Sequence, residues 1–209
     1  MNINRPLRDR LRTAYDQQAT VRDGMESPPW KTCLRAGFLD RLQHEKRQKL
    51  LEIGSGAGKD ALFFQEHGLQ VVCTDLSPEL VRICRSKGLD AREMDAAALD
   101  FPPGSFDALY AFNSLLHIPD AELPAVLKLA ADTLQPEGVA FIGMYGGRDQ
   151  EGIWEDDWYT PKRFFAFRSD AKVRGLLEAC FSVLTFESLE VGDPGGFPFQ
   201  AFTLRRKKF

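Results

Sequence analysis

Apolar residues recur at helical spacing near the start of the chain and form short runs after it. The first residues, to about position 20, predict a helix because one of its faces would carry an apolar stripe. The stripe consists of Leu7, Leu11, Ala14 and Tyr15. A second stripe predicts a helix over residues 31–45, beyond the break at Pro28-Pro29. We therefore expect the chain to begin with two helices.

From residue 49 onward, short apolar runs alternate with amphipathic segments. The apolar runs predict strands at 49–53, 69–74, 90–94, 106–112 and 139–145. The amphipathic segments predict helices at 60–67, from Ser77 to Gly88, and at 120–134. Ser77 is expected to cap the second of these helices, because Pro78 fits the first helical position. Strand–helix alternation predicts a parallel sheet with helices on both faces.

The end of the chain departs from this alternation. A helix is expected near 170–179, followed by strands at 181–191 and 198–205. The turn at 192–196 is too short for a crossover helix, so the last strand should run antiparallel. We predict an α/β fold: a doubly wound, mostly parallel, seven-stranded sheet closed at its edge by an antiparallel last strand. Residues 1–45 are expected to cover the functional site, and residues 46–209 to form a single globular unit.

Composition narrows the class of protein. Apolar residues make up 44% of the 209 residues and charged residues 27%, as in ordinary globular proteins. The net charge of −3 argues against a nucleic-acid partner. No apolar run reaches about 18 residues, and the polar, Arg-rich start does not resemble a secretory signal, so no membrane association is expected. The four cysteines are scattered, which predicts reduced thiols in a cytoplasmic protein and no metal site.

Three features after the first three strands together predict an adenosine site. Gly54, Gly56 and Gly58 form a turn that lets a ligand approach the backbone closely. Asp75, after the second strand, can accept hydrogen bonds from a ribose diol. Asp95, after the third, can accept one from an adenine amino group. Each feature alone also suits a ligand-free loop, so only the three features together indicate an adenosine site.

The glycine spacing argues against a dinucleotide. A pyrophosphate favours G-x-G-x-x-G, whereas this chain has G-x-G-x-G, with Lys59 where that pattern has its third glycine. Glu52, just before the turn, is unfavourable beside a pyrophosphate but suits an ammonium or sulfonium group. A nicotinamide-dependent oxidoreductase is thus disfavoured.

The ordered set of motifs resembles the class I S-adenosylmethionine-dependent methyltransferases over roughly residues 48–145. It comprises Glu52-x-Gly54-x-Gly56-x-Gly58, Asp75, Asp95, Ser105-Phe106-Asp107 and Leu134-x-Pro136-x-Gly138. Leu116-His117-x-Pro119 is similar to the small-molecule (methyltransferase type 11-like) branch. Glu137 is a departure, because the family usually has glycine there. The resemblance implies S-adenosyl-L-methionine as cofactor and a small-molecule methyl acceptor.

The resemblance also implies the roles of individual residues. The turn Gly54–Gly58, including Ser55, faces the methionine part, with Glu52 near it. Asp75 takes the ribose hydroxyls. The remaining cofactor contacts are Leu76, Met94 and Asp95 at the adenine, and Asn113 and Ser114 under the sulfonium.

Candidate residues for the methyl acceptor follow the fourth and fifth strands. His117 is the best-placed candidate base, although it equally suits a structural histidine that bonds a carbonyl. The other candidates are Tyr145, Asp156, Asp157 and Tyr159. Five acids and three aromatic residues at 149–159 could form a negative, aromatic lid that attracts a cationic or amine-bearing acceptor. The alternative is a solvated loop with Trp154 and Trp158 on the core. Tyr15 and Trp30 could also cover the site.

Two functions therefore stay open. The first is methyl transfer to a small molecule, with Tyr145, Trp154, Asp157, Trp158 and Tyr159 as acceptor contacts. The second is a cofactor-binding module without activity that acts as a regulatory or partner subunit. The acceptor and the oligomeric state do not follow from the sequence.

Overall fold

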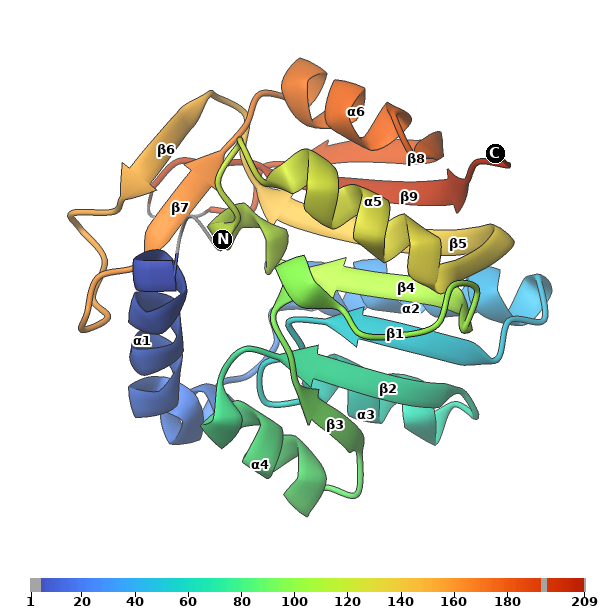
Figure 1. Ribbon diagram of the computed structural model, residues 1–209, viewed down its shortest axis with the longest axis horizontal. Helices are drawn as coiled ribbons and strands as arrows, with labels where there is room; N and C mark the ends of the chain where they lie inside the picture. The colour runs from blue at the N-terminus through green and yellow to red at the C-terminus, as the bar shows by residue number, and fades with distance from the viewer. Residues whose placement is uncertain (1–4, 193–194, 209) are drawn as a thin grey trace.

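The computed structural model describes residues 5–192 and 195–208 and has a central sheet with helices on both faces (Figure 1). In this part of the chain the sheet has seven strands, in the order β3-β2-β1-β4-β5-β9-β8. Its strands are β1 (Lys49–Ile53), β2 (Gln70–Asp75), β3 (Asp90–Glu93), β4 (Phe106–Phe112), β5 (Leu134–Tyr145), β8 (Phe181–Leu189) and β9 (Phe199–Arg206). The helices are α1 (Arg5–Gly24), α2 (Pro29–His44), α3 (Lys59–Glu66), α4 (Pro78–Ser86), α5 (Leu123–Thr133) and α6 (Asp170–Glu178).

The predicted mostly parallel sheet with an antiparallel last strand is confirmed, but the expectation that the last strand lies at the edge of the sheet was wrong. Strands β1 to β5 pair in parallel, and β9 runs antiparallel to both of its neighbours, β5 and β8. The edge strand is therefore β8, and β9 lies inside the sheet. Strand β9 pairs with β8 along one side and with β5 along the other, which leaves β8 at the edge. Of the predicted turn at 192–196, residues 193 and 194 lie outside the described residues.

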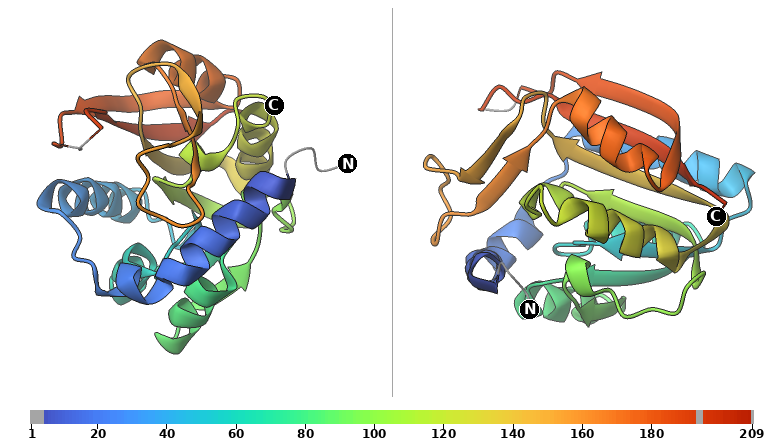
Figure 2. Two further views of the ribbon diagram at one scale, coloured as in Figure 1. Left: turned by 90° about the vertical axis from the view of Figure 1, so that its left-hand side faces the viewer. Right: turned by 45° about the horizontal axis from the view of Figure 1, so that its top comes forward.

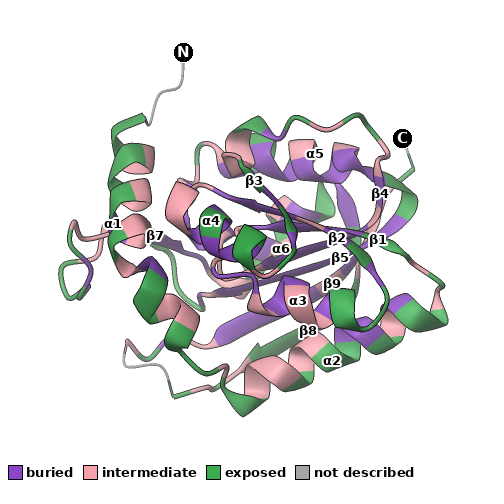
Figure 3. Cartoon of the chain, turned by 90° about the horizontal axis from the view of Figure 1, so that it is seen from below, coloured by how far each residue is buried: buried purple, intermediate pink, exposed green. Residues whose placement is uncertain are grey.

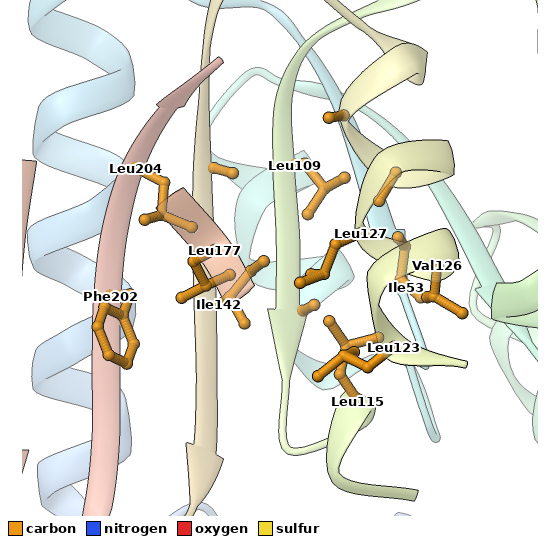
Figure 4. Close-up of a cluster of buried hydrophobic side chains, with 14 of the residues drawn as sticks. Ile53, Leu109, Leu115, Leu123, Val126, Leu127, Ile142, Leu177, Phe202 and Leu204 are labelled. Atoms are coloured by element: carbon orange, nitrogen blue, oxygen red, sulfur yellow. The ribbon is translucent and has the colours of Figure 1, made fainter. Parts of the chain in front are cut away.

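Both faces of the sheet are buried, as helices on both sides require. Successive residues of β4 alternate between two cores: Leu109 belongs to one, and Ala108 and Tyr110 to the other. The first core lies under α5 and α6, where Leu127 and Leu177 contact the sheet (Figure 4). The second lies under α2, α3 and α4. Figure 3 shows most of the inner strands buried and the outer faces of the helices exposed, whereas the edge strands β3 and β8 are largely exposed or half-buried.

Local sequence signals explain where several elements begin or break. The Ser77 hydroxyl accepts a hydrogen bond from the Leu80 N–H at 3.2 Å, which confirms the predicted cap of α4. The predicted turn at 135–138 is an irregular stretch inside β5, where the register with β4 shifts and Glu137 has φ of +64°.

Three of the cysteines are buried free thiols: Cys73 lies in β2, Cys84 lies in α4, and Cys180 follows α6.

A two-stranded antiparallel hairpin lies outside the main sheet and was not predicted. Its strands are β6 (Gln150–Ile153) and β7 (Phe164–Phe167), inserted between β5 and α6. The hairpin projects beside α1 at the end of the sheet toward which β1, β2 and β4 point (Figures 1 and 2). In the described residues, no helix is long and apolar enough to cross a membrane, and no three metal-binding side chains cluster.

Candidate functional site

A cavity of about 390 Å³ lies at the carboxyl ends of the parallel strands, which is where open α/β sheets bind ligands. Helix α1 forms its outer wall, and the residues that follow β1, β2, β3 and β4 form its floor. The cavity falls within the size range of small-molecule sites. Of the residues selected from the sequence, it is lined by Gly54, Gly56, Asp75, Leu76, Met94, Asp95, Asn113, Ser114, His117 and Tyr145.

The glycine turn after β1 is closely packed on one side and open on the other. Gly54, Gly56 and Gly58 all have positive φ, between +56° and +75°, which side chains rarely adopt. A Cβ atom on Gly54 would lie 2.3 Å from the Ser114 Cβ, and one on Gly58 2.6 Å from Leu89 Cδ1. At Gly56 the nearest atom would be an Arg22 guanidinium nitrogen at 3.9 Å. Backbone at Gly56 is therefore accessible from the cavity.

Asp75 at the end of β2 combines structural contacts with a place on the cavity wall. Its Oδ2 accepts the Gly56 N–H at 2.8 Å, and its Oδ1 accepts the Ser77 N–H at 2.9 Å. The side chain thus ties the glycine turn to the start of α4. Burial raises the pKa of Asp75 to about 6 despite these hydrogen bonds.

Asp95 after β3 is held by two contacts. Its carboxylate forms an ion pair with Arg8 of α1, and its Oδ1 accepts the Ala97 N–H at 2.9 Å. Arg8 also pairs with Glu122, so it links α1 to two loops of the sheet. Leu76 and Met94 supply apolar surface to the same part of the cavity.

Three predicted cofactor residues do not line the cavity: Glu52, before the glycine turn, and Ser55 and Gly58 within it. Glu52 is 2% exposed, and burial together with nearby Asp60 raises the pKa of its carboxyl group well above the ordinary value. Its Oε2 is buried without a hydrogen-bond partner among the described residues. Glu52 therefore influences the turn from beneath it.

The other half of the cavity has an aromatic wall. Trp30 stacks on Phe112 with ring centroids 5.8 Å apart and meets the edge of Tyr145 at 6.4 Å. Lys31 lies over the Phe112 ring at 4.5 Å and forms an ion pair with Asp60 at 2.8 Å. The expectation that Tyr15 and Trp30 cover the site agrees with their positions on the wall.

His117 lines the cavity, but both ring nitrogens have partners. Nδ1 lies 2.7 Å from the Phe164 carbonyl oxygen, which only accepts, so Nδ1 carries the proton. Nε2, 2.7 Å from the Tyr15 hydroxyl, therefore accepts the Tyr15 proton. Burial, reinforced by the charge of Arg163, lowers the pKa of His117 to about 3. In this arrangement the imidazole fixes α1 and is a poor base.

The structure places the four predicted acceptor contacts of the hairpin loop outside the cavity wall. Trp154 packs edge-to-face against both Phe167 and Phe197, and Trp158 is 60% exposed. Asp157 is buried, and its two oxygens accept hydrogen bonds from the Arg163 guanidinium at 2.8 and 2.9 Å. Tyr159 is buried beneath Arg163, whose guanidinium carbon lies 3.5 Å from its ring centroid.

The predicted negative lid is absent because most of its acids have structural partners in the described part of the chain. Asp149 accepts the Ser169 N–H at 2.7 Å, and Glu151 accepts the Asp120 N–H at 2.9 Å. Glu155 pairs with Lys162, and Asp157 with Arg163. Asp156 is exposed. The charged side chains from α1 and α2 on the cavity wall are instead cationic: Arg8, Arg22 and Lys31.

Several cavity residues were not anticipated. They are Arg8, Arg22, Met25, Pro28, Lys31, Leu80, Ala96, Phe112, Ile118, Pro119 and Phe164, together with Leu7 and Leu11 of the α1 stripe. The apolar stripe indicated that one face of α1 is buried. It did not indicate that this face covers the cavity. The arginines of α1 carry no local signal, because their partners lie far away in sequence.

Residues 50–138 match the family model described as a methyltransferase domain. This segment contains the glycine turn, Asp75, Asp95 and the loop after β4. Over these residues the chain is similar to methyltransferase domains. The match begins in β1 and ends in β5, so α1 and the β6–β7 hairpin lie outside the matched segment.

Two curated relatives are similar over part of this chain. A ubiquinone biosynthesis O-methyltransferase from Xanthomonas campestris is 33% identical over 103 residues, which cover 45% of this chain and 41% of the relative. A phosphoethanolamine N-methyltransferase from Plasmodium falciparum is 22% identical over 151 residues, covering 68% and 56%. The alignments thus span about half of each relative or less.

Solved structures share the fold at low sequence identity. A 1,6-didemethyltoxoflavin-N1-methyltransferase from Burkholderia thailandensis, solved with S-adenosylhomocysteine, has a TM-score of 0.75 at 19% identity, with 100% of this chain and 92% of that chain covered. The cyclase SpnF has a TM-score of 0.63 at 20% identity, with coverages of 82% and 80%. The fold alone therefore does not define the reaction.

Proposed function

We propose that this chain binds S-adenosylmethionine in the cavity and transfers its methyl group to a small-molecule acceptor. One observation carries the proposal: the glycine turn, Asp75 and Asp95 follow three different strands and meet at a single cavity. The methyltransferase domain match over residues 50–138 supports it. Residues 1–45 would then belong to the site as its cover.

The groups on the cavity floor suit the parts of the cofactor. Each oxygen of Asp75 holds one backbone N–H and keeps a lone pair for a ribose hydroxyl. Leu76 and Met94 offer apolar contacts to the adenine ring, beside the acceptor oxygens of Asp95. The open side of Gly56 leaves room for the amino-acid part. The cavity therefore has a suitable group for each of these parts.

When bound, S-adenosylmethionine supplies an already activated methyl group, so the protein chiefly orients the acceptor and excludes water. In this proposal Asn113 and Ser114 support the centre of the cavity, between the glycine turn and the aromatic wall. The role of base expected for His117 is not retained, because its Nε2 lone pair is occupied by Tyr15 and its pKa is low. His117 instead positions Tyr15.

For the acceptor we propose a flat, unsaturated molecule. The wall formed by Trp30, Phe112 and Tyr145 offers ring faces and edges for stacking. The cationic acceptor inferred from the acids at 149–157 is not retained, since most of those acids have structural partners and Lys31 brings a positive charge over the Phe112 ring. A neutral or anionic acceptor fits this charge better than an amine.

Calorimetry and a turnover assay test the proposal. S-adenosylhomocysteine should bind with a stoichiometry of one, whereas NAD should not bind. With S-adenosylmethionine present, a panel of phenols, aromatic carboxylic acids and alkyl amines should yield S-adenosylhomocysteine only with aromatic members. Binding of NAD alone would refute the proposed cofactor, and turnover confined to alkyl amines would refute the acceptor class. Tight cofactor binding without turnover across a broad acceptor panel would favour the inactive binding module.

A further inference from the structure

Arg22, near the end of α1, is the cavity cation that lacks an acidic partner. Arg8 pairs with Asp95 and Glu122, and Lys31 pairs with Asp60. Among the described residues, Arg22 forms no ion pair; its one side-chain hydrogen bond runs from NH1 to the Tyr159 hydroxyl at 2.9 Å. Its Nε is buried without a partner. A sheltered cation without a counter-ion is costly, which favours an anionic ligand beside it.

The surroundings hold the guanidinium in a defined position. Its central carbon lies 5.0 Å from the centroid of the Tyr15 ring, and Tyr15 is itself fixed by its hydrogen bond to His117. Tyr159, which accepts from NH1, is buried under Arg163. These contacts orient the guanidinium but leave its charge unneutralised.

The free side of the guanidinium lies beside the glycine turn. Its NH2 atom would be 3.9 Å from a Cβ atom on Gly56, and both residues line the cavity. Arg22 is therefore next to the part of the cavity where the backbone is open to a ligand. In the proposed binding mode the turn Gly54–Gly58 faces the amino-acid part of the cofactor, so an anion beside Gly56 suits that part better than the acceptor.

We infer that Arg22 binds the carboxylate of the amino-acid part of S-adenosylmethionine, through charge-assisted hydrogen bonds across the open side of Gly56. This inference rests on the proposed function. It assigns to α1, which lies outside the matched family segment, a direct part in cofactor recognition. Glu52, buried beneath the same turn, is not required for this contact.

The test uses two ligands that differ in one group. S-adenosylhomocysteine carries the carboxylate, whereas its decarboxylated analogue keeps the amine, ribose and adenine. The variant Arg22→Met should weaken binding of S-adenosylhomocysteine about 10- to 100-fold, as loss of charge-assisted hydrogen bonds predicts, and change binding of the analogue less than about twofold. Arg22→Lys should recover part of the loss. Calorimetry measures the dissociation constant of each ligand for the parent and for each variant.

Arg10→Met is the matched control, because Arg10 is an exposed residue of α1 whose guanidinium donates to the Lys162 carbonyl oxygen at 3.2 Å. It should bind both ligands like the parent. Equal binding of S-adenosylhomocysteine by the parent and Arg22→Met overturns the inference, as does an equal loss for both ligands in both Arg22 variants. If the loss appears only with an anionic acceptor, Arg22 serves the acceptor instead. Failure of the parent to bind either ligand refutes the proposed function itself.

Discussion

The pH dependence of cofactor affinity should report the ionisation of Asp75. Burial raises the pKa of this carboxyl group to about 6 in the free protein. Ribose hydroxyls donate hydrogen bonds to the ionised form, so the pKa of Asp75 should be lower in the complex. A group whose pKa falls on binding contributes affinity above its free pKa and loses it as the pH falls below that value. Affinity for S-adenosylhomocysteine should therefore be level above about pH 7 and decline below about pH 6.

The size of the effect follows from the fraction of ionised Asp75. With a free pKa of about 6, roughly nine-tenths of the molecules carry the charged form at pH 7 and about one-tenth at pH 5. The dissociation constant should thus rise about tenfold between these two pH values. Binding should release about 0.9 proton at pH 5 and about 0.1 at pH 7. His117 does not contribute in this window, because its pKa is about 3.

Calorimetric titrations with S-adenosylhomocysteine in buffers of different ionisation enthalpy measure both quantities. Asp75→Asn should bind more weakly and with little pH dependence. Asp90→Asn is the control, since the carboxylate of Asp90 is about half exposed in its pair with Arg92 and should leave the pH profile unchanged. A flat profile for the parent between pH 5 and 7, or an unchanged slope in Asp75→Asn, would show that Asp75 does not bind the ribose as an ionised group.

Two further substitutions test the architecture of the site by urea denaturation. Gly54→Ala should lower the free energy of unfolding by about 2–5 kcal/mol, from a positive-φ cost of about 1–2 and an overpacking cost of about 1–3 against the Ser114 Cβ. Gly68 also has a positive φ, +90° against +71° at Gly54, but a new Cβ there would meet open space, so a loss in Gly68→Ala as large as that of Gly54→Ala would contradict the packing argument. Asp157→Asn should lower the free energy of unfolding by about 3 kcal/mol, because it leaves the buried guanidinium of Arg163 without its carboxylate. An unchanged unfolding midpoint in Asp157→Asn would show that the pair with Arg163 does not stabilise the fold.

Local patterns were sufficient to predict most of the sheet. A parallel sheet buried on both faces needs apolar residues at successive positions, and β1 and β4 show such runs. The pairing of β9 with β5 could not be predicted, because a hairpin determines only one partner of each strand. The hairpin strand β6 was missed for a different reason: Gln150-Glu151-Gly152 lacks both alternation and β-branched residues, and pairing with β7 alone holds it extended.

The floor of the site was predictable because topology, rather than side-chain detail, brings strand ends together. Asp75 ends β2 and Asp95 follows β3. Because these neighbouring strands are parallel, their carboxyl ends meet at the same edge of the sheet, which brings the two residues near one another. The wall could not be predicted in this way. Arg8 and Arg22 lie in a helix whose position over the cavity depends on partners about 90 to 140 residues away, including Glu122 and Tyr159. Acids in a loop likewise give no indication of whether they face a ligand or an arginine such as Arg163.

The two halves of the cavity are held in place by different forces. The floor follows strands whose side chains are buried on both faces, so its geometry is coupled to the hydrophobic core. Helix α1 is attached at the opposite side by polar contacts, among them Arg8 with Asp95, Lys87 with Asp23 and Tyr15 with His117, and by a small apolar cluster in which Ala19 packs with Ala57, Leu80 and Ile83. Because this cluster is much smaller than the two cores that bury the sheet, α1 can separate from the floor at lower cost than an inner strand can. A cofactor carboxylate at Arg22 would add one attachment of α1 that exists only in the complex, and so would join cofactor binding to closure of the wall.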